Sequence, residues 1–153
     1  DLLLGALNSI AVDYIARLKV GGTHLTYSYL KQFPILPLNS SNQKSYRIRS
    51  IILELTYTSH SLRPWAEELG YTGPPFPFDS DRRAHLRAEL DAIYARLYGL
   101  NREELQFILD PAATHGRDYP TETFRGLKKN EEREFGEYRT QRLVLESWDR
   151  MAP

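Results

Sequence analysis

The sequence predicts a mostly α fold, a helical bundle whose helices are joined by extended loops rich in proline and aromatic residues. Apolar residues recur at intervals of three and four along several stretches, which is typical of helices with one buried face. Capping residues stand at the ends of these stretches, and prolines gather between them. A chain of 153 residues is long enough for one hydrophobic core. We therefore expect one compact unit.

The first part of the chain, residues 1–42, carries an apolar stripe from Leu2 to Lys19 that predicts a single helix. Gly21 and Gly22 end this helix, because a glycine pair tolerates positive φ angles and is entropically costly inside regular structure. Thr26 or Ser28 is expected to cap a short helix from Tyr29 to Phe33. Pro34 to Asn42 is then an exposed linker.

The helical part, residues 43–153, begins with Ile48, Ile51, Ile52 and Leu55, whose spacing favours a helix from Tyr46 to Thr58. A strand stays possible there because isoleucine is β-branched. Ser61 is expected to cap a short helix that ends at Leu69. The prolines and aromatic rings of Tyr71 to Phe78 exclude a helix and predict an extended segment lying across the bundle.

The stretch from Leu86 to Asp110 predicts a helical hairpin, around which the rest of the chain is organised. The first helix has a buried face, and Gly99 follows it as a C-terminal cap. Asn101 and Glu104 have the spacing of a capping box for the second helix. The inward positions of the first helix are Leu86, Leu90, Ile93, Tyr94, Leu97 and Tyr98. Asp79 or Ser80 is expected to begin the hairpin.

The end of the chain is predicted to be irregular from Pro111 to Thr123 and then helical, at least from Glu131, as far as Trp148. Its expected inward residues are Phe135, Tyr138, Leu143, Leu145 and Trp148. On one continuous helix, residues 128, 132, 135, 139 and 142 would share a face.

Composition excludes several classes of function. Lysine plus arginine equals aspartate plus glutamate at 20 each, so any nucleic-acid surface must be local. No apolar run approaches the length of a membrane span, and the lack of cysteine fits a cytoplasmic protein. The chain begins with Asp1 and has no signal-peptide pattern, which indicates a piece of a longer protein. No catalytic motif or metal-ligand spacing is present, so we expect no catalytic residue, bound cofactor or metal in this piece.

Two local groups of cations are candidates for binding phosphate. Lys44, Arg47 and Arg49 lie at the start of a predicted helix, where the helix dipole disfavours cations and an anionic partner would relieve the conflict. Arg139 and Arg142 lie in a segment with nearly as many acids as bases. For that segment a salt-bridged surface is favoured over a phosphate-binding strip.

Short motifs across nearly the whole chain resemble the C-terminal part of restriction-modification proteins. Gly21-Gly22-Thr23-His24-Leu25, Tyr29-Leu30 and Phe33-Pro34-Ile35-Leu36-Pro37 resemble the end of a target-recognition region. The tail is similar to that of the large type IIG and phage-defence adenine-specific DNA methyltransferases, and more loosely to type I specificity subunits. It carries Leu55-Thr56-Tyr57-Thr58, Leu69-Gly70-Tyr71, Glu89-Leu90-Asp91-Ala92, Leu97-Tyr98-Gly99-Leu100, Glu104-Leu105, Ile108-Leu109-Asp110, Phe135-Gly136-Glu137-Tyr138-Arg139-Thr140 and Arg142-Leu143-Val144-Leu145.

The resemblance implies a parent that methylates adenine in a recognised DNA sequence, with S-adenosylmethionine as cofactor. The Asn-Pro-Pro-Tyr or Asp-Pro-Pro-Tyr tetrad and the Gly-rich cofactor loop of that chemistry are absent from this chain. The implied partners are double-stranded DNA and the N-terminal catalytic domain of the same protein.

The implied DNA contacts fall into three groups. Gly21 and Gly22 would allow a close backbone approach, and Thr23, His24 and Thr26 would reach base edges or phosphates. The cations that would neutralise phosphates are Lys31, Lys44, Arg47 and Arg49, with Arg139 and Arg142 as further candidates. The alternative is a structural cap that docks a partner subunit or the catalytic domain without touching DNA.

Overall fold

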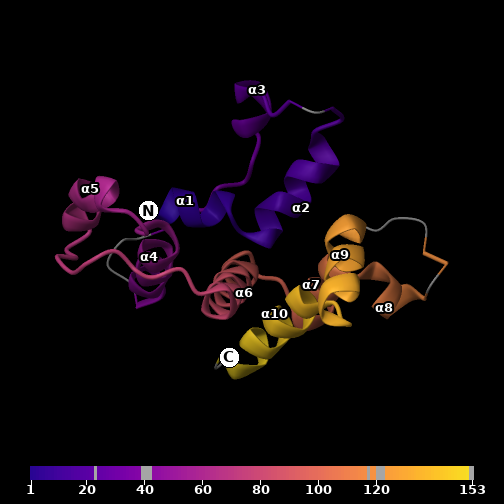
Figure 1. The fold of residues 1–153 in the computed structure, drawn as a ribbon. Helices are drawn as coiled ribbons and strands as arrows, with labels where there is room; N and C mark the ends of the chain where they lie inside the picture. The colour runs from indigo at the N-terminus through magenta and orange to yellow at the C-terminus, as the bar shows by residue number, and fades with distance from the viewer. Residues whose placement is uncertain (23, 39–42, 117, 120–122, 152–153) are drawn as a thin grey trace.

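A computed structural model of the chain describes residues 1–22, 24–38, 43–116, 118–119 and 123–151 (Figure 1). These residues form ten α-helices and one 3-10 helix, and none of them lies in a strand. The predicted mostly α bundle is confirmed. No helix in the described ranges has both the length and the apolar character that crossing a membrane requires.

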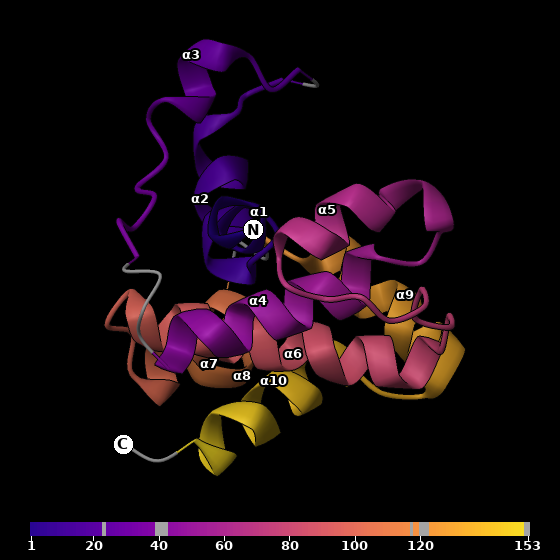
Figure 2. The ribbon, with the colours of Figure 1, turned by 90° about the vertical axis from the view of Figure 1, so that its left-hand side faces the viewer.

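Both helices of the predicted hairpin are present, but they pack mainly against the last helix of the chain and make little contact with each other. The first of the two, α6, lies at the centre of the bundle (Figure 2). Helix α6 spans Ser80–Leu97, and Asp79 caps it by accepting a hydrogen bond from the N–H of Arg82. Gly99 has a φ of 76°, as a helix-ending glycine requires. Helix α7 spans Arg102–Leu109 and begins with the predicted capping box, which joins Asn101 and Glu104.

Two hydrophobic clusters meet at α6. Leu86, Leu90, Ile93 and Tyr94 are buried as predicted, whereas Leu97 and Tyr98 are only partly buried. One cluster packs α6 against the first and fourth helices, and the other packs α6 and α7 against the last helix. The other helices of the bundle therefore pack against two different sides of α6.

The predicted single helix from Leu2 to Lys19 is wrong. Helix α1 spans Leu2–Leu7, and α2 spans Ile10–Lys19 in a different direction (Figure 1). The Oγ of Ser9 donates to the carbonyl of Ala6 at 2.7 Å and caps α2 by accepting from Val12 at 3.4 Å. The carboxylate of Asp91 in α6 accepts a hydrogen bond from the N–H of Ile10 at 2.7 Å. This contact from a distant element fixes the break.

The next two helices differ from the prediction mainly in their ends. Helix α3 spans Tyr27–Leu30, so it begins and ends earlier than expected, and its N-cap residue Thr26 makes no side-chain capping bond. Helix α4 spans Gln43–Thr56, which confirms a helix and excludes the strand. Part of the predicted linker, residues 39–42, lies outside the described residues.

The proline-rich segment, residues 71–78, contains no helix, as predicted, and the chain bends at Gly73 instead of running fully extended. The 3-10 helix η1 spans His60–Leu62 and is capped by Ser59, in place of the expected Ser61, and α5 spans Arg63–Glu68. Beyond α5, the ring of Tyr71 stacks on Phe76 at 5.0 Å between centroids. The N–H of Phe76 donates to the carbonyl of Tyr57 at 2.8 Å, which holds the segment on the bundle.

The C-terminal part contains three helices where one was expected. Helix α8 spans Pro111–His115 inside the segment predicted to be irregular. Helices α9, Arg125–Phe135, and α10, Arg139–Arg150, are separated by Gly136, whose φ is 75°. Tyr138, Leu143 and Trp148 are buried as predicted and Leu145 is partly buried, but Phe135 is 45% exposed. Phe135 faces outward because it ends α9 just before the chain turns.

Candidate nucleic-acid interface

The predicted DNA contacts near the N-terminus lie on a segment that projects from the bundle. We call residues 18–38 the N-terminal arm; it extends from the end of α2, carries α3 and returns to the bundle at Ile35 and Leu38, which pack against the cluster around α4 and α6 (Figures 1 and 2). Gly21, Gly22, His24, Thr26 and Lys31 are all exposed on it. Thr23 lies outside the described residues. The arm therefore presents five of the eleven predicted contacts together.

The glycine pair is open to its surroundings. Apart from its own chain neighbours, a Cβ atom at Gly21 or Gly22 would meet no heavy atom of the described residues within 4 Å. Helix α2 ends at Lys19, just before the pair, as predicted, but neither glycine has a positive φ, so the left-handed conformation is not used there. A stretch without side chains also lets a ligand approach the backbone closely.

Charge is distributed unevenly around the arm. No Asp or Glu stands between Asp13 and Glu54, and this interval contains six cations: Arg17, Lys19, Lys31, Lys44, Arg47 and Arg49. The balanced total for the whole chain hides this interval. A count of charge along the sequence, in place of the net sum, was the signal that could have found it.

The three arginines of this interval form ion pairs within the bundle. Arg17 pairs with Asp13 at 3.0 Å, and Arg47 pairs with Glu89 of α6 at 2.5 Å. The hydrogen bond to Glu89 raises the pKa of Arg47. Arg49 pairs with Asp1. A DNA phosphate would have to compete with these carboxylates.

The three lysines differ from the arginines. Lys19, Lys31 and Lys44 are exposed, and none of them forms an ion pair with another residue in the described ranges. The Nζ of Lys31 lies 4.4 Å from the ring centroid of Tyr27. This contact is with a ring and involves no carboxylate, so the charge of Lys31 is not neutralised by an acidic side chain. The available positive charge of the interval therefore lies on these lysines.

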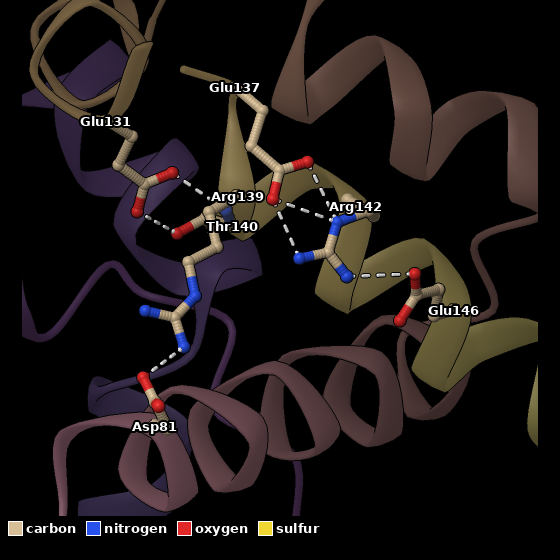
Figure 3. Close-up of polar contacts among 7 residues, drawn as sticks. All are labelled: Asp81, Glu131, Glu137, Arg139, Thr140, Arg142 and Glu146. Carbon is tan, nitrogen blue, oxygen red and sulfur yellow. Dashed lines mark hydrogen bonds and ion pairs between the residues drawn. The ribbon is translucent and has the colours of Figure 1, made fainter. Parts of the chain in front are cut away.

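Arg139 and Arg142 are held in a network near the start of α10 (Figure 3). Arg139 pairs with Asp81 at 2.9 Å and lies over the ring of Phe135. Arg142 pairs with Glu137 at 2.8 Å and with Glu146 at 3.0 Å, and these bonds raise the pKa of Arg142. The geometry is that of a salt-bridged surface.

The predicted shared face of residues 128, 132, 135, 139 and 142 does not exist, because the helix breaks at Gly136. Glu131 of α9 instead reaches across the break and accepts hydrogen bonds from the N–H and Oγ1 of Thr140, at 2.7 and 2.6 Å. The first N–H groups of α10 are thereby partly satisfied.

Within the described part of the chain, no three or more His, Asp or Glu side chains are arranged so that they could hold a metal ion. Comparisons with known protein families, curated proteins and solved structures find no match for this chain.

Proposed function

We propose that this chain is the C-terminal helical region of an adenine-specific, S-adenosylmethionine-dependent DNA methyltransferase of the restriction-modification type. The N-terminal arm contacts duplex DNA. The motif resemblance supports the family. One observation carries the DNA contact: residues 14–53 contain no Asp or Glu, and the three lysines of this interval are exposed and form no ion pair with another described residue.

Each group has a part in this contact. Lys19, Lys31 and Lys44 neutralise phosphates, and the open turn at Gly21 and Gly22 admits the DNA backbone. His24 and Thr26 supply polar groups beside that turn. Methyl transfer and cofactor binding belong to the catalytic domain of the parent protein, because this chain carries neither the catalytic tetrad nor the cofactor loop.

The test is fluorescence-anisotropy binding of the chain to duplex DNA across a salt series, with a polyanion competitor. The lysines are changed together, as Lys19→Ala, Lys31→Ala and Lys44→Ala. Arg47 and Arg49 are left in place, because their ion pairs hold α4 to the bundle. We expect the slope of log K against log salt to become shallower by about 0.9 for each phosphate that the variant no longer neutralises.

The matched control removes the same charge elsewhere, as Lys129→Ala, Arg133→Ala and Arg150→Ala. These three residues are exposed and lie on α9 and α10. The control should keep the slope of the unsubstituted chain. Equal decreases in slope in both triple variants would show that binding follows net charge alone, and would contradict the assignment of the contact to the arm and Lys44.

The second candidate function is a cap that docks the catalytic domain or a partner subunit. It is favoured by apolar side chains on the same arm, since Leu18, Leu25 and Tyr27 are 66%, 56% and 71% exposed. Failure of the chain to bind DNA at low salt would favour this function. Leu18→Ser and Leu25→Ser should then abolish co-purification with the separately expressed catalytic domain.

A further inference from the structure

An aromatic pocket lies between α2, α7 and α8, in a place that the proposed DNA contact does not use. Its volume is about 760 Å³. The rings of Phe107, His115 and Tyr119 line it and contact one another, with centroids 5.0 to 5.7 Å apart. Tyr14 of α2 supplies a fourth ring and the buried Ile108 an apolar contact.

Local structure explains why these rings meet. Pro111 begins α8 immediately after α7 ends, so the chain reverses and brings His115 back to Phe107. Gly116 has a φ of 91°, which lets the chain turn again. The N–H of Tyr119 then donates a hydrogen bond to the carbonyl of Gly116. The Nδ1 of His115 lies 2.9 Å from the Oγ1 of Thr114, a contact that orients the imidazole ring.

The charge at this pocket is negative. Glu103 and Glu104 are among its lining residues, and no lysine or arginine is among the lining residues that the structure describes. The carboxylate of Glu104 accepts a hydrogen bond from the N–H of Asn101 in the capping box. Glu103 is exposed and makes no hydrogen bond or ion pair with another described residue. One carboxylate at the rim is therefore available to a ligand.

Aromatic faces and a carboxylate together select a cation. A ring face carries negative potential, and a cation with an apolar surface gains contact with the ring while its charge approaches the carboxylate. A phosphate would meet two carboxylates here and no cation. The chemistry of this pocket is thus opposite to that of the N-terminal arm.

We propose that the pocket binds an organic cation, an alkylammonium or guanidinium group carried on an apolar stem. Phe107, Tyr119 and Tyr14 contact the stem and the charged group, and Glu103 compensates the charge at the rim. Such a group comes from a free small molecule or from a lysine or arginine side chain of a peptide. This site is independent of the DNA contact.

The test is an NMR titration of the whole chain that follows the aromatic ring signals. The probes are choline, its neutral isostere 3,3-dimethylbutan-1-ol, and a short peptide with one lysine and uncharged ends. We expect choline to shift the signals of Phe107, His115 and Tyr119, and the neutral isostere to leave them in place. Shifts with the peptide alone would identify a side chain as the source and would also support the proposal.

Three variants and one control locate the site. Phe107→Leu and Tyr119→Leu should each weaken binding of the active probe by about threefold or more. Glu103→Gln should weaken it without changing the fold, because Glu103 is exposed and unbonded, whereas the exposed Glu68→Gln on α5 should have no effect. Binding of the isostere as tight as that of choline, no shift with either cation, or equal effects of Glu103→Gln and Glu68→Gln would each overturn the proposal.

Discussion

Asp91 offers the sharpest test of how the bundle holds its N-terminal helices. Its side chain is buried beneath the start of α2 and accepts a hydrogen bond from the N–H of Ile10 at 2.7 Å. Burial raises the pKa of Asp91 from 3.8 to about 7, and the nearby charge of Asp13 adds to this effect. The hydrogen bond from Ile10 and the charge of Arg87 oppose it.

The raised pKa has a definite sign for stability. Between about pH 4 and pH 7 the folded chain keeps a proton on Asp91 that the unfolded chain has released. The contribution of Asp91 to the free energy of unfolding is therefore fully present below pH 4 and is lost as the pH rises through 7. The displacement of the pKa from 3.8 to about 7 corresponds to about 4 kcal/mol, since one pKa unit is worth about 1.4 kcal/mol.

The perturbation is Asp91→Asn, which removes the titrating charge and keeps an oxygen that can accept from Ile10. Urea unfolding of both chains from pH 4 to pH 8 measures the difference between them. We expect the free energy of unfolding of the variant to rise relative to the unsubstituted chain by up to about 4 kcal/mol over this range.

The control for this series is Glu134→Gln, an exposed carboxylate of α9, whose difference from the unsubstituted chain should not follow pH in this way. A difference between Asp91→Asn and the unsubstituted chain that moves in the opposite direction with pH would refute the reasoning. It would show that the charged carboxylate stabilises α2 and that its pKa is lowered in the folded chain.

Three further substitutions, with Gly21→Ala as the control for the last, test local features by thermal or urea unfolding. Gly5→Ala would place a Cβ 2.8 Å from the Oη of Tyr94, so it should destabilise the chain by about 1–3 kcal/mol. An unchanged stability would mean that α1 is free to shift. Asn101→Ala removes the capping box and should cost about 1 kcal/mol; an unchanged stability would show that water replaces the cap. Gly136→Ala should cost about 1 kcal/mol because φ is 75° there, whereas Gly21→Ala, with negative φ and open space, should be nearly neutral; equal effects at both glycines would contradict the backbone argument.

Features that depend on neighbours in the sequence could be predicted. The capping box at Asn101 and Glu104 and the glycine end of α6 at Gly99 are local, and both were located correctly. Four buried positions of α6 follow from apolar spacing, because residues three and four apart lie on one face of a helix. These positions are Leu86, Leu90, Ile93 and Tyr94. The second buried side was not predicted, because it is buried only when the last helix packs on α6; it holds Ala88, Ala92 and Ala95. The position of the candidate interface near Gly21 and Gly22 was also a local inference, and its binding role stays a prediction.

Features that depend on distant contacts could not be predicted. The apolar stripe runs unbroken from α1 into α2, and the break at Ser9 is fixed by Asp91, which is far away in the sequence. The pairing of Arg47 with Glu89 likewise arises only when α4 packs on α6. Packing thus determines which cations are compensated by carboxylates and which remain available.

The sequence by itself determined the helical class, the main helices and the clustering of cations near the arm, because periodicity, capping and charge order are properties of neighbouring residues. Only the tertiary structure decided where the terminal helices divide, which of the cations form ion pairs, and that Tyr14 meets Phe107, His115 and Tyr119 at one pocket. These outcomes require side chains from separate helices to meet, and their separation in sequence carries no information about that encounter.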